Sequence, residues 1–139
     1  MAETNFKLNY PLRLAKSGIH GVGAFTEKKI LARKKIGSMG GTIISERAAN
    51  AKAKTKEVLH LVEYGNGKTL DGTVNGNALS HVNHSCVPNT YIRILGWHVE
   101  FYALKNIKAG EEITCDYGIT YHDGKLRCGC RAKGCKGFL

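Results

Sequence analysis

Hydrophobic residues in this chain come in short runs that are separated by glycine-containing turns. Residues 12–14 and 24–26 are joined by the glycine-containing segment 18–23. Residues 35–36 and 42–44 are likewise joined by a glycine-rich turn. Short apolar runs bounded by turn residues are typical of β-strands. The pattern therefore predicts two pairs of short strands in the first part of the chain.

One segment, residues 46–56, is rich in Ala and Lys and predicts the main helix. Ser45 precedes it as a good N-cap, and the negative charge of Glu46 suits the positive end of a helix dipole. After the helix, residues 58–64 and 68–71 predict two extended segments joined by a Gly-Asn-Gly turn.

Residues 91–95 and 99–104 predict a β-hairpin that turns around Gly96 and its tryptophan neighbour. Apolar and polar residues alternate along the second strand, as expected when one face is buried and the other exposed. A last strand is expected at residues 112–115, after a turn at residues 106–110. Together these elements indicate a mostly β fold with many short strands and one or two short helices.

The totals fit one compact domain. The chain has 139 residues, of which 42% are hydrophobic and 17 are glycine. No apolar run approaches the roughly 20 residues that span a bilayer, and the polar start does not resemble a secretory signal. We therefore expect an intracellular protein, either nuclear and chromatin-associated or cytoplasmic, that is not secreted. In such a reducing compartment, clustered cysteines favour metal binding or catalysis over disulfides.

The net charge is +10, and basic residues gather in segments 28–35 and 52–56. This excess fits either a solubilising surface or attraction to nucleic acid or nucleoprotein, and charge alone does not separate the two.

Three cysteines near the C-terminus, Cys128, Cys130 and Cys135, form the pattern C-x-C-x4-C. Zinc in a structural site takes four ligands in a tetrahedron, so one position is left to fill. Cys86, Cys115 or a histidine could supply the fourth ligand, and unrelated cysteines or a disulfide are the alternatives. A site closed by four thiolates has no open position, which makes the expected zinc structural.

Two further runs are specific in combination. Residues 83–86 read Asn-His-Ser-Cys, and residues 110–118 read GEEITCDYG. Taken singly, Asn83 and His84 could cap a short helix, and Tyr117 could belong to the core. With a Gly-Val-Gly turn before them and the cysteine pattern after them, the chain resembles the SET-domain family of protein lysine methyltransferases.

The resemblance extends over about residues 10–137 and implies the SET fold, which consists of small curved β-sheets with a C-terminal pseudoknot. The SET domain is expected over residues 10–120 and a post-SET zinc-binding tail over residues 121–139. The chain is expected to be a minimal, single-domain member of the family.

The resemblance also implies S-adenosylmethionine as methyl donor and Tyr117 as the catalytic tyrosine. Phe138 would close over the cofactor, with a frayed terminus as the alternative. The implied cofactor-binding residues are Gly21, Val22, Gly23, Asn83, His84, Tyr117 and Phe138. The implied zinc ligands are Cys86, Cys128, Cys130 and Cys135.

The chain departs from the family pattern in three places. Ser80 and His81 stand where the family commonly has Arg-Phe, and Met39 stands where a tyrosine is often found. Cys115 replaces a Phe or Tyr whose size limits the number of methyl groups added. Because cysteine is smaller, we predict di- or trimethylation, with Tyr91 beside Cys115 in the substrate channel and partly filling the gap.

The implied substrate is a lysine of a histone or of another basic, DNA-associated protein, with possible nonspecific contact to nucleic acid. Possible acidic contacts for it, each with an ordinary surface position as the alternative, are Glu63, Glu100, Glu111 and Glu112. Two competing hypotheses are a zinc-stabilised nucleic-acid- or chromatin-binding module and a catalytically inactive SET-like domain. The sequence carries no prediction of the oligomeric state.

Overall fold

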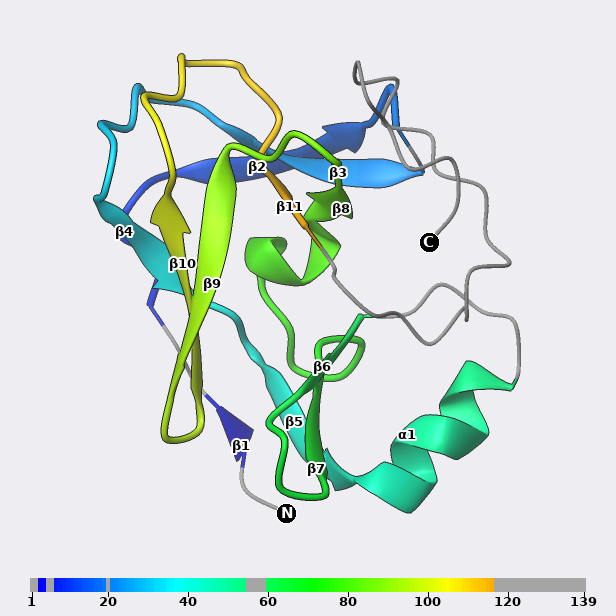
Figure 1. Cartoon of the computed structure of the whole chain (residues 1–139). Helices are drawn as coiled ribbons and strands as arrows, with labels where there is room; N and C mark the ends of the chain where they lie inside the picture. The colour runs from blue at the N-terminus through cyan, green and yellow to red at the C-terminus, as the bar shows by residue number, and fades with distance from the viewer. Residues whose placement is uncertain (1–2, 5–6, 20, 55–59, 117–139) are drawn as a thin grey trace.

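The computed structural model describes residues 3–4, 7–19, 21–54 and 60–116 (Figure 1). This part of the chain is mostly β. Its strands are β1 (Glu3–Thr4), β2 (Leu12–Lys16), β3 (Val22–Thr26), β4 (Lys35–Ser38), β5 (Gly41–Ser45), β6 (Leu61–Glu63), β7 (Lys68–Asp71), β8 (Asn83–His84), β9 (Thr90–Leu95), β10 (His98–Ala103) and β11 (Thr114–Cys115). Its helices are α1 (Glu46–Ala53) and the short 3₁₀-helix η1 (Ala78–His81).

The described strands form four small sheets. One contains β1, β5, β7 and β6 in that order, and a second contains β4, β10 and β9. β2 pairs with β3, and β8 pairs with β11. In Figure 1 the β8–β11 pair lies near the centre, the β2–β3 pair crosses above it, and α1 lies to the lower right. The central pair is therefore surrounded by the other sheets.

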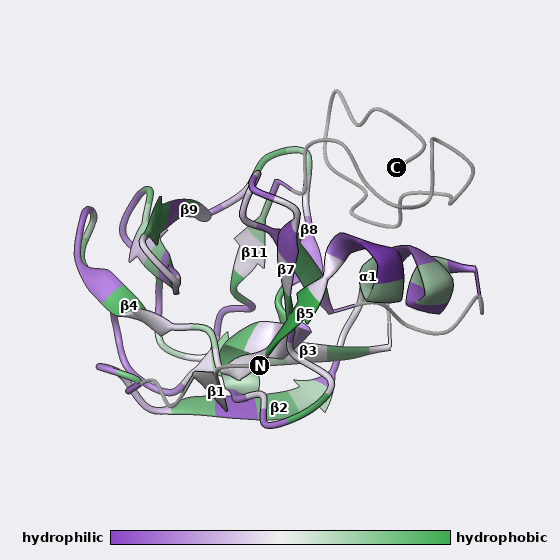
Figure 2. Ribbon diagram, turned by 90° about the horizontal axis from the view of Figure 1, so that it is seen from below, coloured by the Kyte–Doolittle hydropathy of each residue, from purple (hydrophilic) through white to green (hydrophobic). Residues whose placement is uncertain are grey.

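A shared hydrophobic core holds these sheets together. The described residues with large, fully buried apolar side chains are Ile30, Ile36, Leu70, Leu79, Val99, Ile107 and Ile113. They come from strands of different sheets, from η1 and from loops, so these sheets share one core. Figure 2 shows hydrophobic and hydrophilic residues alternating along β2, where Leu12 packs against this core and Leu14 is 46% exposed.

The predicted local elements are largely confirmed. The hairpin forms from β9 and β10, and the four strands expected in the first part of the chain appear as β2, β3, β4 and β5. β2 pairs with β3, whereas β4 and β5 lie in different sheets and do not pair with each other. Ser45 is the N-cap of α1, and its side chain accepts a hydrogen bond from the backbone N–H of Ala48. The helix ends at Ala53, earlier than predicted, and the C-cap Lys54 donates its backbone N–H to the carbonyl oxygen of Asn50.

Two local predictions are wrong. Glu100 was expected on the exposed face of its strand, but it is 7% exposed because Lys35 Nζ lies 2.6 Å from its carboxylate. The last strand is limited to β11 and does not reach back to Glu112, which makes only an isolated bridge to Phe25. In the part of the chain that is described, no helix is long and apolar enough to cross a membrane.

Candidate functional site

The centre of the site is the parallel pairing of β8 with β11. Asn83 lies opposite Thr114, and His84 lies opposite Cys115. The backbone N–H of Ser85 extends the pairing by donating to the carbonyl of Cys115 at 3.0 Å. The Asn-His pair is thus brought beside the segment that leads to Tyr117. The pair does not cap η1, because Asn77 is the N-cap and Val82 the C-cap of that helix.

Asn83 connects this pair to the glycine turn before β3. Its side-chain amide donates to the backbone carbonyl of Val22 at 3.3 Å and to Glu112 Oε2 at 3.0 Å. Asn83 is 7% exposed, so the amide is held in place by burial as well as by these bonds. The predicted cofactor residues Asn83 and Val22 are therefore neighbours in space.

Gly21 and Gly23 each favour glycine at their position, but for different physical reasons. Gly21 has φ +46, in the left-handed region that glycine adopts without steric cost, and a Cβ on it would meet nothing within 4 Å. Gly23 has no room for a side chain, because a Cβ there would lie 2.3 Å from Glu112 Oε2 and 3.2 Å from Asn83 Nδ2. One end of the turn faces open space while the other is packed closely.

A carboxylate beneath the turn ties the site together. Ser17 Oγ donates to Glu112 at 2.9 Å and 2.8 Å from the two carboxylate oxygens. Ser17 also donates its backbone N–H to the carbonyl of Gly21 at 2.8 Å. Nothing local in the sequence marks Ser17, and Glu112 is only one of four acidic residues considered for substrate contact. We call Ser17, Gly21, Val22, Gly23, Asn83 and Glu112 the glycine-turn site.

Asn89 fixes the position of the segment that carries Glu112. Its side chain donates to Glu111 Oε2 at 2.9 Å and to the backbone carbonyl of Glu112 at 2.8 Å. Its amide oxygen accepts from the backbone N–H of Thr114 at 2.9 Å. The Asn89 side chain thus makes the backbone hydrogen bonds with Glu112 and Thr114 that a neighbouring strand would otherwise make. Glu111 is therefore an internal partner of Asn89, and of the four acidic residues considered only Glu63 is exposed.

His84 lies between two groups of the predicted site. It is 3% exposed, its Nε2 lies 3.3 Å from Cys86 Sγ, and its Nδ1 lies 3.8 Å from Asp116 Oδ1. Cys86 is a predicted zinc ligand, and Asp116 directly precedes Tyr117. Zinc bound by Cys86 would therefore lie close to His84, whose other ring nitrogen faces Asp116 at the end of the described chain.

The two predicted channel residues occupy different surroundings. Cys115 is 3% exposed within the hydrophobic core, and burial, helped by Asp116, raises its thiol pKa to about 12. Tyr91 is 38% exposed and stacks on Tyr102, with ring centroids 5.5 Å apart. Their common place in a substrate channel stays a prediction.

Several predicted residues lie outside the described part of the chain. They are Tyr117, Cys128, Cys130, Cys135 and Phe138. Cys86 is described and partly buried. Within the described residues, no group of three or more metal-binding side chains occurs, but three of the four predicted zinc ligands fall outside this range.

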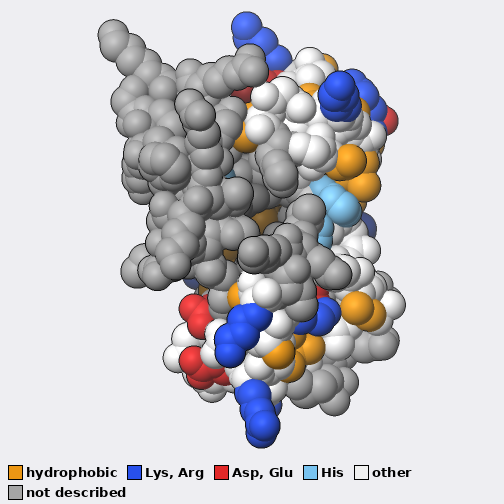
Figure 3. Space-filling model, turned by 90° about the vertical axis from the view of Figure 1, so that its right-hand side faces the viewer, with side chains coloured by type: hydrophobic (Ala, Val, Ile, Leu, Met, Phe, Trp, Pro, Cys, Tyr) orange, Lys and Arg blue, Asp and Glu red, His pale blue; other side chains and the backbone are white. Residues whose placement is uncertain are grey.

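The family departures are accommodated by local packing. Met39 is buried in the core, and Ser80 is buried with its hydroxyl donating to the carbonyl of Asn77 at 2.7 Å. The ring of His81 lies edge-on to His60 at 4.7 Å, and burial, followed by the charge of His60, lowers the pKa of His81. Histidine side chains reach the surface on the side of the molecule shown in Figure 3.

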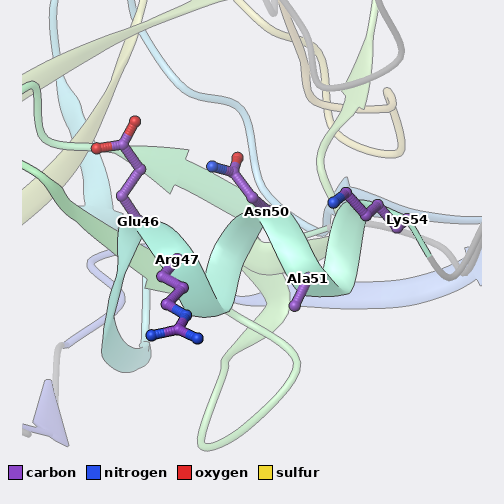
Figure 4. Close-up of a pocket in the computed structure, with 5 residues that line it drawn as sticks. All are labelled: Glu46, Arg47, Asn50, Ala51 and Lys54. Carbon is purple, nitrogen blue, oxygen red and sulfur yellow. The ribbon is translucent and has the colours of Figure 1, made fainter.

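A surface hollow on α1 lies apart from this site. It is lined by Glu46, Arg47, Asn50, Ala51 and Lys54, all from one helix (Figure 4). Glu46 and Arg47 point to opposite sides of the helix in this view, so the side chains do not converge on one point. The hollow therefore lacks the arrangement of a catalytic site.

Comparison with known proteins adds to this geometry. Residues 21–118 match the model of the SET domain family. The chain is 32% identical to histone-lysine N-methyltransferase trithorax of Drosophila virilis, over 89% of this chain and 3% of that protein. It is 32% identical to histone-lysine N-methyltransferase 2B of Homo sapiens, over 89% of this chain and 5% of that protein. It is 34% identical to histone-lysine N-methyltransferase set-2 of Caenorhabditis elegans, over 92% of this chain and 9% of that protein. The chain thus spans less than a tenth of each of these relatives.

Proposed function

The chain belongs to the SET domain family, and from this premise we propose that it is a protein lysine N-methyltransferase. It would transfer a methyl group from S-adenosylmethionine to the ε-amine of a lysine. The substrate would be a histone or another basic, DNA-associated protein, and the protein would act on chromatin or an equivalent nucleoprotein. The observation that supports this most is that Asn83 hydrogen-bonds the carbonyl of Val22 while its strand pairs with β11.

The glycine-turn site suits the methyl donor. Gly21 borders open space, and Val22 is 49% exposed, so the turn can lie against a ligand. Asn83 and His84 lie beside the turn on β8 and would hold the cofactor from that side. Phe138 is proposed to close over it. When bound, S-adenosylmethionine supplies an electrophilic methyl group on a sulfonium ion.

The residues of this chain would contribute mainly by positioning. Methyl transfer forms an N–C bond as the C–S bond breaks in line with it, so alignment of the two atoms supplies much of the rate. The free lysine has a pKa of about 10.4, and a dry channel disfavours its charged form, so the amine releases its proton before attack. We assign to the Tyr117 hydroxyl the role of orienting the amine.

The post-SET tail is proposed to bind one structural zinc ion. Thiolates of Cys86, Cys128, Cys130 and Cys135 provide the soft donors that zinc prefers. Cys86 lies on the turn after β8 and next to His84, so a tail attached there would lie at the cofactor side of the fold. This divides the chain into a SET domain at residues 10–120 and a zinc-binding tail at residues 121–139.

The small side chain of Cys115 favours di- or trimethylation. A residue of this size leaves more room beside the amine than the Phe or Tyr that it replaces, and Tyr91 is proposed to line the same channel. Mass spectrometry of the methylated product tests this. Exclusively monomethylated lysine would refute it.

The deciding experiment uses labelled S-adenosylmethionine with free histones, nucleosomes and other basic DNA-binding proteins. We expect label on lysine with the wild-type protein and at least a tenfold slower rate with Tyr117→Phe. Calorimetry with S-adenosylmethionine separates the alternatives. A nucleic-acid-binding module would give no heat of binding, and an inactive SET-like domain would bind the cofactor without transferring label.

A further inference from the structure

Exposed basic side chains gather where the loop at residues 27–34 meets the loop at residues 104–110. They are Lys28, Lys29, Arg33, Lys34, Lys105 and Lys108. Glu27 is the one acidic residue within these two ranges, and the carboxylate of Glu111, just after the second range, accepts a hydrogen bond from the backbone N–H of Lys108 at 3.2 Å. We call these six side chains the basic end. Lys35, which belongs to the same run in the sequence, is not part of it because it pairs with Glu100.

The two loops are fixed to each other by backbone hydrogen bonds. Ile30 and Ile107 are fully buried and exchange both bonds, at 2.9 Å and 2.8 Å. The backbone N–H of Ala32 also donates to Asn106 Oδ1 at 2.9 Å. In Figure 1 the two loops lie side by side at the upper left. The basic side chains therefore extend from a rigid support.

Two features of these loops lower the stability of the folded protein. The antiparallel bridge between Ile30 and Ile107 places Lys29 and Lys108 at facing positions, and like charges that face each other across a bridge are destabilising. Arg33 has φ +71, a left-handed conformation that side chains other than glycine seldom adopt. A polyanion bound here would offset the repulsion between Lys29 and Lys108, so the charge arrangement favours a binding surface for an anion.

The basic end lies at a distance from the glycine-turn site. β3 begins at Val22 in that site and leads into the loop that starts at Glu27, and a five-residue strand spans roughly 13 Å. Residues 110–115 run back beside β3 through bonds such as Gly110 N–H to the carbonyl of Thr26 at 2.7 Å. A partner at the basic end would therefore leave the glycine-turn site open.

We propose that the basic end binds the phosphate backbone of double-stranded DNA. This rests on the proposed function, because DNA held here would bring its bound basic proteins close to the methyl-transfer site. A free basic tail would be repelled by the same charges, so the surface favours substrates in complex with DNA.

On the face seen in Figure 3, Lys and Arg side chains lie apart at the upper and lower ends and do not form one patch.

The test measures binding of a short DNA duplex by fluorescence anisotropy over a series of salt concentrations. Six phosphate contacts predict a slope of log K against log salt of about −5. The triple variant Lys29→Gln, Lys105→Gln, Lys108→Gln should reduce the magnitude of this slope by about 3 and weaken binding at least tenfold. The matched control removes three exposed charges elsewhere, with Lys7→Gln, Arg47→Gln and Lys54→Gln, and should change affinity by less than about threefold.

Two outcomes would overturn the proposal. One is equal loss of DNA binding in both triple variants. The other is preference for polyglutamate over DNA, which would identify an acidic protein as the partner, with the exposed Leu31 and Leu104 adding apolar contact. Methylation assays separate DNA binding at the basic end from the proposed methyltransferase activity. The basic-end variant should methylate free histone at least as fast as the wild type and lose its preference for nucleosomes, whereas DNA binding without any methylation would refute only the proposed function.

Discussion

The carboxylate of Glu112 fills the space beside Gly23, where a Cβ would lie only 2.3 Å from Oε2. The same carboxylate accepts hydrogen bonds from Ser17 and Asn83. A glycine early in the chain, an asparagine in the middle and a glutamate near the last described strand thus depend on one another. The close approach of Gly23 is what allows the amide of Asn83 to reach the turn.

Gly23→Ala should weaken cofactor binding. A Cβ cannot approach an oxygen this closely, so alanine would push the carboxylate away from Ser17 and Asn83. Loss of hydrogen bonds to a charged group should lower the free energy of unfolding by about 1.5–3 kcal/mol. We expect calorimetry to show at least a tenfold weaker affinity for S-adenosylmethionine.

Gly18→Ala is the matched control, because a Cβ on Gly18 would meet nothing within 4 Å. Its free energy of unfolding should stay within about 0.5 kcal/mol of wild type, with unchanged cofactor affinity. If Gly23→Ala matched this control in both measurements, the close contact would have no functional role.

Glu112→Ala tests the carboxylate directly. Ser17 and Asn83 would lose a common acceptor, so the amide of Asn83 would no longer be held against Val22. We expect KM for S-adenosylmethionine to rise about tenfold with a smaller change in kcat, because the residue positions the site without touching the reacting atoms. Glu112→Gln retains one acceptor and should show a milder effect. The exposed Glu63→Ala should leave both constants unchanged.

The local elements could be predicted because their signals are local. Ser45 can cap a helix whatever surrounds it, and Gly96 marks a hairpin between two alternating segments. The parallel pairing of β8 with β11 has no such signal, because strands so far apart can pair in many ways. That part of the site was implied by the family resemblance and not by the pattern of residues.

The internal roles of the acidic residues could not be predicted for the same reason. Glu112 and Ser17 are 95 residues apart, and Glu100 and Lys35 are 65 apart. A glutamate at a strand position is usually on the surface, so only the fold reveals that these two carboxylates pair with side chains far away in the sequence.

Lys52→Ala should destabilise the packing of α1. Lys52 is ion-paired with Asp71 on β7, whose side chain is 1% exposed. Removing the lysine would leave a buried carboxylate without its countercharge, at a cost of about 2–3 kcal/mol. Lys54→Ala, on the exposed side of the same helix end, should cost less than about 0.5 kcal/mol. Urea unfolding of both variants checks this, and equal midpoints would contradict it.

Glu100 should make stability depend on acid pH. The hydrogen bond from Lys35 holds the pKa of Glu100 below its ordinary value of 4.5, against the effect of burial, with help from Tyr102. A lowered folded pKa stabilises the protein above the unfolded value, and this stabilisation is lost as pH falls from about 4.5 through the folded value. Glu100→Gln should therefore lose less stability than wild type over this range. Parallel curves of unfolding free energy against pH would contradict the assignment.

The two described cysteines should differ sharply towards thiol reagents. The raised pKa and burial of Cys115 keep its thiol protonated and shielded at pH values near neutrality, so iodoacetamide should not label it until the protein unfolds. Cys86 is partly buried and is proposed to bind zinc, so it should become labelled when a chelator removes the metal.

Methylation should fall in the same chelated sample before circular dichroism detects unfolding, because Cys86 lies beside His84. Peptide mass spectrometry with and without chelator reads out each cysteine separately. Equal labelling of Cys86 in both samples would refute its role as a ligand. Full activity after chelation would mean that the zinc-bound tail supports the fold without shaping the site where the cofactor binds.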